Sequence, residues 1–179
     1  MSKNTSPDPT RRHLLMAAGV GAAAIGAALA WRHQKASVPL SPEAQAFWAA
    51  RFEKLQGGEL VTSSLHGKPL ILNFWASWCA PCVKELPEIN QFAHETPAWQ
   101  VLALAVDSKE AVDKFLQKLP VDLPIALAGL TGTDLSRTLG NAQGGLPFSV
   151  AFDANGELIW KKLGSTSLAE LRDLTKKYS

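Results

Sequence analysis

The chain contains two cysteines, and both lie in the short segment Trp75-Ala76-Ser77-Trp78-Cys79-Ala80-Pro81-Cys82. The apolar run 70–75 (LILNFW) precedes them directly and has the composition of a buried strand. A helical pattern runs from Ala80 to about Glu95, and Pro81 is tolerated in its first turn because the missing N–H has no intrahelical acceptor there. No other feature restricts the fold as much as a buried strand that leads into a Cys-x-x-Cys pair at a helix start.

Two thiols this close in sequence serve as metal ligands, a structural staple or a redox pair. A closed zinc site needs four ligands, and the histidines are scattered along the chain: His13, His33, His66 and His94. A disulfide across two residues closes a very small loop and removes little entropy from the unfolded chain. The residues therefore favour redox exchange.

Redox exchange requires a thiolate, and an ordinary cysteine is mostly protonated at neutral pH. Cys79 is expected at the N-terminus of the helix, where free N–H groups and the helix dipole stabilise a negative charge. Cys82 lies one turn further in and is expected to be the shielded, resolving thiol. Trp78 is expected to border this site at the surface, and Trp75 is expected in the core.

The composition is that of a globular chain, with 46% hydrophobic residues, 19% charged residues and a net charge of +2. The lysines are dispersed, and the pairs Lys161-Lys162 and Lys176-Lys177 are interpreted as solvated faces without interleaved aromatic residues. Nucleic acid is therefore not an expected partner. The length is that of one domain.

The N-terminal segment has the pattern of an export signal. Arg11-Arg12 precedes an Ala/Gly-rich run, residues 14–31, that carries no charge and would span about 27 Å as a helix. Residues 10–15 (TRRHLL) resemble the start of a twin-arginine signal, and Ala28-Leu29-Ala30 has the form of a signal-peptidase site. A membrane anchor, cleavage near Ala30 and a buried core helix all remain open, with targeting favoured over the core helix.

The flanking charges give a small bias toward an N-terminus inside the cell, because Lys3, Arg11 and Arg12 precede the run whereas Arg32 and Lys35 follow it. We therefore expect the rest of the chain in the periplasm or at the cell exterior, either anchored in the inner membrane or released by cleavage. Residues 1–36 are predicted to be the signal or anchor with its linker, and residues 37–179 the folded domain.

The rest of the chain alternates between helical and strand patterns. Helices are predicted at 42–55, ended by Gly57-Gly58, and at 80–95, 109–119, 134–139 and 167–177. Strands are predicted at 59–62, 70–75, 100–106, 124–127, 148–152 and 157–163, the last two joined by a hairpin at Asn155-Gly156. This order predicts an α/β fold with parallel strands early and a hairpin late.

These motifs resemble the TlpA/ResA-like thiol-disulfide oxidoreductases of the thioredoxin superfamily over roughly residues 40–177. The resemblance rests on the run from Leu72 to Cys82 followed by Glu85, Leu86 and Pro87, and on Gly145-Leu146-Pro147 before Asp153-x-Asn155-Gly156. It implies a thioredoxin-like fold in which helices flank a central mixed sheet. It also implies a cis Leu146–Pro147 bond that faces the dithiol, and no cofactor.

The resemblance assigns catalysis to Cys79 and Cys82, and substrate binding to Trp78, Leu146 and Pro147. Thioredoxin has a buried aspartate six residues before its first cysteine, where this chain has Asn73, which cannot shuttle a proton. Members of the anchored branch carry an acid one turn beyond the second cysteine, and Glu85 stands there. We expect Glu85 to be catalytic, and a solvated glutamate favoured by the helix dipole is the alternative. Phe148-Ser149, where the family often has threonines, is a second departure.

The favoured function is that of a periplasmic protein-disulfide reductase. Its Cys79 would attack a substrate disulfide, and its Cys82 would resolve the resulting mixed disulfide. The resemblance implies a membrane electron donor of the DsbD/CcdA kind and, most readily, a role in cytochrome c maturation. A thiol oxidase of the DsbA kind and an anchored, non-catalytic binding or chaperone module are the alternatives. A peroxiredoxin is disfavoured, because its motif needs proline and a hydroxyl residue where this chain has Leu72 and Ala76.

Overall fold

The computed structural model describes residues 39–129 and 131–178. The predicted export segment, with Arg11-Arg12 and the cleavage site near Ala30, lies outside the described residues. Within the described ranges, no helix combines the length and the hydrophobicity that a membrane span requires.

A seven-stranded mixed sheet forms the centre of the domain, in the order β2-β1-β5-β4-β3-β6-β7. Strands β3, β4 and β5 are parallel, and the others pair with their neighbours in antiparallel fashion. The strands are β1 (Arg51–Lys54), β2 (Glu59–Val61), β3 (Leu70–Trp75), β4 (Gln100–Ala105), β5 (Ile125–Leu127), β6 (Phe148–Phe152) and β7 (Leu158–Leu163).

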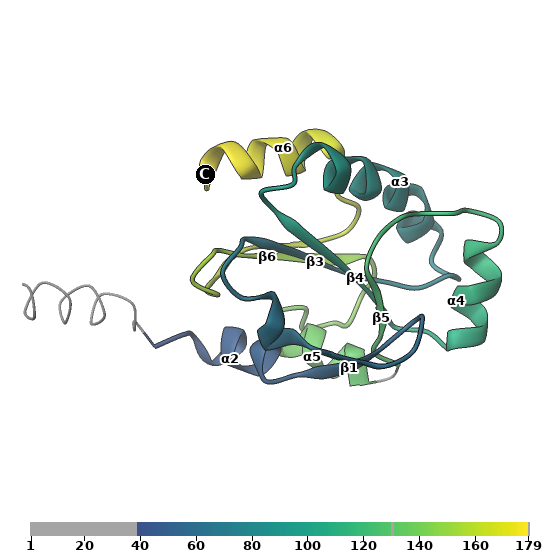
Figure 1. Cartoon of the computed structure of the whole chain (residues 1–179), viewed down its shortest axis with the longest axis horizontal. Coiled ribbons are helices and arrows are strands. Elements are labelled where there is room, and N and C mark those ends of the chain that lie inside the picture. Colours follow the sequence, from purple (N-terminus) through teal and green to yellow (C-terminus); the bar gives the residue numbers. More distant parts are fainter. Residues whose placement is uncertain (1–38, 130, 179) are drawn as a thin grey trace, which may run out of the picture. The chain divides into compact units, whose positions relative to one another are not determined.

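Helices cover both faces of the sheet, as Figure 1 shows. Helices α3 and α6 pack on one face, to which α4 also contributes, and α2 and α5 pack on the other. The helices are α2 (Pro42–Trp48), α3 (Ala80–Glu95), α4 (Lys109–Leu116), α5 (Thr131–Thr138) and α6 (Leu168–Lys177), with a 3-10 turn, η1, at Thr62–Leu65. The predicted thioredoxin-like arrangement is confirmed.

The prediction of one helix from residue 42 to about 55 is wrong. Helix α2 begins as predicted, with the Ser41 hydroxyl accepting from the Ala44 N–H at 3.3 Å, but it ends at Trp48. The next residues form β1, which turns through Gly57-Gly58 and pairs with β2. Both glycines have positive φ, 91° and 83°, so they form a hairpin turn and not a helix end.

The predicted hairpin between β6 and β7 is confirmed. Gly156 has φ of 90°, and a Cβ atom there would lie 2.4 Å from Cε1 of His66. The indole N–H of Trp48 donates to the Gly156 carbonyl at 2.6 Å and ties α2 to the hairpin. Glycine is therefore required by both the turn and the close packing.

Candidate active site

The two cysteines lie where β3 passes into α3. Cys79 is the N-cap residue of α3, and its sulfur accepts from the Cys82 N–H at 3.4 Å. The two residues form a disulfide with their Cα atoms 5.3 Å apart, so the structure represents the oxidised form. Cys79 is 5% exposed and Cys82 is 0% exposed. The outer position of Cys79 is the one expected of an attacking thiol.

The same geometry favours a thiolate at Cys79 once the disulfide is reduced. The sulfur lies at the positive end of a 16-residue helix and next to an N–H that already points at it. Both features stabilise a negative charge and lower a thiol pKa. Pro81 occupies the first turn of α3 without loss of a hydrogen bond, as the sequence predicts.

Asp107 anchors the loop between β3 and Cys79. Its carboxylate accepts from the N–H and the hydroxyl of Ser77, at 2.9 and 2.6 Å. The neighbouring Val106 N–H donates to the Trp75 carbonyl at 2.8 Å. Sequence reasoning missed Asp107, although parallel β3 and β4 end at the same sheet edge and an acid directly after the second strand was a usable signal.

The two tryptophans beside the dithiol occupy the predicted environments. Trp78 is 70% exposed, whereas Trp75 is fully buried and packs against Phe115 with ring centroids 5.3 Å apart. An exposed indole directly before the attacking cysteine is available to a partner protein. Its role in binding stays a prediction.

Glu85 is buried, which excludes the alternative of a solvated glutamate. The residue is only 2% exposed and lies one turn beyond Cys82 on α3. One carboxylate oxygen accepts from the Asn73 amide at 2.7 Å, and the other accepts from the Thr166 N–H at 2.7 Å. The Asn73 amide also donates to the Ser149 hydroxyl at 2.9 Å. These four residues form a buried polar cluster one turn of α3 beyond Cys82.

Burial raises the pKa of the Glu85 carboxyl, because the charged form loses its hydration. The hydrogen bonds from Thr166 and Asn73 and the positive charge of Lys162 act in the opposite direction, and the negative charge of Glu88 adds to the rise. The net effect is a carboxyl that takes up a proton more readily than an ordinary glutamate. Such a group is suited to exchanging protons with a thiol.

The loop before β6 completes this end of the sheet. The Leu146–Pro147 bond is cis, as expected, and Leu146 packs against the cluster of buried residues that includes both cysteines. Asn141, which is 2% exposed, holds the loop through two hydrogen bonds to the Gly145 main chain, at 2.8 and 3.2 Å. Nothing in the sequence around Asn141 distinguished it from an ordinary loop residue.

A second exposed apolar side chain lies beside this loop. Leu163 at the end of β7 is 52% exposed, and its Cδ1 would lie 3.2 Å from a Cβ atom placed on Gly145. Leu163 pairs with Phe148, which in turn pairs with Phe74 near the end of β3. Trp78 and Leu163 therefore lie at the same end of the sheet as the dithiol and the Pro147 loop.

Comparisons with known proteins match most of the chain. A family model described as Redoxin matches residues 39–176, and a model described as "Ubiquitinol-cytochrome C reductase Fe-S subunit TAT signal" matches residues 1–31. A "Thiol-disulfide oxidoreductase ResA" of Bacillus cereus is 31% identical over 126 residues, which make up 69% of this chain and 70% of that protein.

Two solved structures extend the comparison. The structure of MTB dsbF in its mixed oxidized and reduced forms has a TM-score of 0.66 and 26% identity, and the match covers 80% of this chain and 100% of that chain. A thioredoxin-related protein from Neisseria meningitidis serogroup B has a TM-score of 0.58 and 29% identity, with 65% of this chain and 88% of that chain covered. The Redoxin match includes every residue of the site described above.

Proposed function

The chain belongs to the Redoxin family as a TlpA/ResA-like thiol-disulfide oxidoreductase, and on that premise we propose that it reduces the disulfides of exported proteins outside the cytoplasm. The observation that carries the proposal is the buried carboxyl of Glu85, held one turn behind a cysteine pair at a helix N-terminus. The proposed site comprises Cys79, Cys82 and Glu85, with Trp78, Leu146 and Pro147 contacting the client.

The reaction begins with the reduced protein. The Cys79 thiolate attacks one sulfur of a client disulfide, forms a mixed disulfide and releases the other client sulfur, which takes up a proton. The Cys82 thiol then loses its proton and attacks the Cys79 sulfur, which releases the second client sulfur as a thiol. The client gains two electrons and two protons, and the protein is left with the Cys79–Cys82 disulfide seen in the structure.

Glu85 is proposed to take the proton from Cys82 in the second step. Cys82 is fully buried, so water has little access to its thiol. Glu85 lies three residues further along the same helix, which places the two side chains on neighbouring turns. The raised carboxyl pKa reduces the difference in acidity between donor and acceptor.

The Glu85 carboxyl also supports electron transfer from this protein to the client. A strongly oxidising dithiol is one whose reduced, thiolate form is stabilised. A buried carboxylate near the sulfurs disfavours a second negative charge, and so it opposes the stabilisation that the α3 N-terminus gives to the thiolate. The reduced protein is then the better electron donor.

Equilibration of the purified full-length chain with a glutathione redox buffer tests this direction. We expect a reduction potential in the range of thioredoxins and glutaredoxins, about −200 to −270 mV. A potential near the DsbA value of about −120 mV would support the oxidase alternative. In cells, a Cys79→Ser/Cys82→Ser double variant that retains function would instead support the binding module.

Export and the client are further parts of the proposal. The match of residues 1–31 to a TAT signal model and the Arg11-Arg12 pair support export through the twin-arginine route. Replacement of both arginines by lysine is expected to leave the protein in the cytoplasm, and normal export of that variant would contradict the route.

We propose a membrane dithiol donor of the DsbD/CcdA kind as the source of electrons, with the N-terminal segment holding the domain at the inner membrane. Apocytochrome c is the proposed client. A Cys82→Ser variant should trap the client as a mixed disulfide, which mass spectrometry would identify. Trapping of other exported proteins without any apocytochrome c would remove cytochrome c maturation from the proposal.

A further inference from the structure

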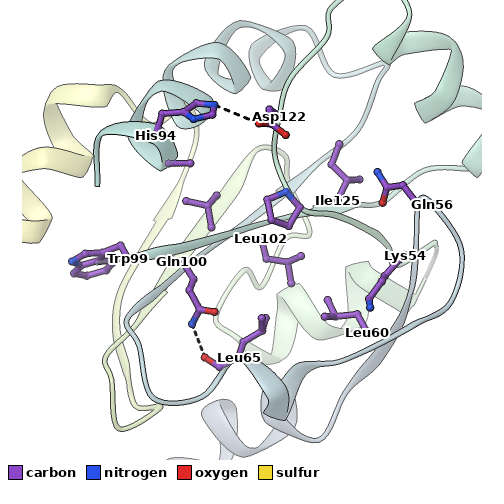
Figure 2. A pocket seen from close by; sticks show the side chains of 13 residues that line it. Lys54, Gln56, Leu60, Leu65, His94, Trp99, Gln100, Leu102, Asp122 and Ile125 are labelled. Carbon is purple, nitrogen blue, oxygen red and sulfur yellow. Dashed lines mark hydrogen bonds and ion pairs between the residues drawn. The ribbon is translucent and has the colours of Figure 1, made fainter. Parts of the chain in front are cut away.

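A cavity of about 370 Å³ lies at the end of the sheet opposite the dithiol. It is lined from the start of β4, the end of α3, the β1–β2 hairpin, η1 and the start of β5. The apolar part of its wall includes Leu60, Leu65, Leu102 and Ile125, and Figure 2 shows how these side chains surround it. The proposed redox function uses none of these residues.

The main chain of Val101 is open toward this cavity. Strands β4 and β5 pair as far as Ala103, whose N–H donates to the Pro124 carbonyl at 2.9 Å. In a parallel ladder the next bond would run from the N–H of residue 124 to the Val101 carbonyl, and proline has no N–H to donate. Among residues 39–129 and 131–178, no main-chain group outside the strands bonds to Val101 either.

Val101 is only 6% exposed and lines the cavity, so its carbonyl and N–H are polar groups in an apolar wall. Buried main-chain groups without partners cost free energy comparable to a lost hydrogen bond. A molecule that enters the cavity with a hydrogen-bond donor beside an apolar body would recover that free energy. Because Pro124 has no N–H, the start of β5 cannot donate this hydrogen bond to the Val101 carbonyl itself.

The charges around the cavity favour a negative ligand in one orientation. Lys54 lies on the β1 side, and its ammonium forms no ion pair with any residue that the structure describes. Asp122 lies elsewhere on the rim and faces His94, with 3.9 Å between the carboxylate oxygen and the ring nitrogen. Figure 2 shows the His94–Asp122 pair and Lys54 at different sides of the cavity.

We propose that this cavity binds a small organic anion, with a ring-like apolar body between the leucine side chains, a hydrogen-bond donor on the Val101 carbonyl and an acidic group beside Lys54. The volume lies in the range of small-molecule sites, and the lining has their usual form of apolar walls with a few polar groups. This binding site is separate from the dithiol and does not depend on the proposed function.

Indole-3-acetate has all three features and serves as the probe. It is titrated to millimolar concentration into the isotopically labelled full-length chain while amide resonances are recorded by NMR. We expect saturable shifts at Val101 and Ala93 and at most small shifts at Trp78 and Gly145. Shifts confined to the dithiol end, or no saturable shift, would overturn the proposal.

Two variants test the charge and the space. Lys54→Gln should weaken indole-3-acetate binding several-fold and abolish the preference for indole-3-acetate over the neutral indole-3-acetamide, whereas Lys118→Gln, another exposed lysine outside the cavity, should change neither. Ala93→Trp should fill the cavity and prevent binding while disulfide exchange continues, which shows that the fold is intact. Unchanged binding in both Lys54→Gln and Ala93→Trp would place the probe elsewhere.

Discussion

The two faces of the central sheet differ in what they bury. Toward α2 and α5, alternate residues of β3 and β6 present Phe74, Phe148 and Phe152 to an apolar layer in which Phe47 stacks on Phe152 with ring centroids 4.7 Å apart. The intervening residues of the same strands face α3 and α6, and there the Asn73 amide donates both to the Glu85 carboxylate and to the Ser149 hydroxyl.

This difference places a cost in stability on the face that also carries the cysteines. Buried aromatic rings gain free energy from leaving water and from packing. A buried carboxyl and its polar partners cost desolvation free energy that their hydrogen bonds only partly offset. Both faces bury an apolar cluster that stabilises the domain, but the α3/α6 face also holds the buried carboxyl of Glu85, one turn of α3 beyond Cys82.

The largest expected effect is on the chemical face. Cys79→Ser should abolish disulfide exchange without unfolding the domain, because only the outer sulfur is accessible to a partner. Cys82→Ser should instead accumulate mixed disulfides, which non-reducing electrophoresis detects. Equal trapping by both variants would contradict the assignment of attacking and resolving thiols.

A large truncation on the α2/α5 face should lower stability and leave the redox chemistry unchanged. Phe152→Ala removes a fully buried ring and should lower the free energy of unfolding by about 3–5 kcal/mol, measured by urea denaturation. The reduction potential of the fraction that stays folded should not change. The matched surface substitution Leu163→Ala should alter the unfolding free energy by less than about 0.5 kcal/mol. A large change in potential for Phe152→Ala would break the separation of the two faces.

Glu85→Gln should shift acid–base behaviour while the fold is kept. Removal of the buried carboxylate should lower the pKa of at least one thiol, because a negative charge next to the sulfurs disfavours a second one. Thiol titration of the reduced protein measures this shift. The control is Glu95→Gln, an exposed carboxylate at the far end of the same helix, where distance and water screen its effect on the thiols. Superimposable titration curves for wild type and Glu85→Gln would remove Glu85 from the site.

Glu85→Gln should also change how the free energy of unfolding depends on pH. Since burial raises the pKa of Glu85, the folded protein holds a proton over a range of pH above 4.5 in which the unfolded chain has lost it. The contribution of this group is fully present below pH 4.5 and is lost as the pH rises through the raised pKa. The decline in stability should therefore be shallower in Glu85→Gln, and identical slopes would contradict the buried carboxyl.

The smallest expected effect is in the loop between β3 and α3. Ser77→Ala removes the hydroxyl that donates to Asp107 but keeps the main-chain donor, so the cost should be about 1 kcal/mol in unfolding free energy. A change in the rate of exchange larger than this destabilisation implies would show that the loop also positions Cys79. Ser64→Ala, which removes an exposed hydroxyl bond to Val61, is the matched control.

Local signals in the sequence predicted much of the fold. The bounds of α3, β3 and β6 agree with the predictions, because each is a long or strongly apolar segment with a clear start. The strand β1 was missed, since Arg51–Lys54 follows a helical pattern directly and the two glycines after it were interpreted as a helix end. Its place in the sheet and the hairpin turn at Gly57-Gly58 depend on pairing with β5, which is remote in sequence.

The candidate site was predictable where one motif holds its residues together. Cys79, Cys82, Glu85 and Pro147 belong to motifs with a recognisable spacing. Asp107 and Thr166 do not, because each reaches the site through a long-range contact, with Ser77 and Glu85 respectively. The role of the Thr166 main chain could not be predicted, since any residue except proline offers the same N–H.

The hydrogen bond from Thr166 to Glu85 joins residues 81 positions apart in the chain. During synthesis, α3 is complete long before Thr166 exists, and until then the Glu85 carboxyl is hydrated and behaves as an ordinary acid. The burial of the carboxyl is complete only once the segment around Thr166 has packed against α3. If Glu85 tunes the thiols as proposed, the dithiol acquires its mature acid–base properties only at the end of folding.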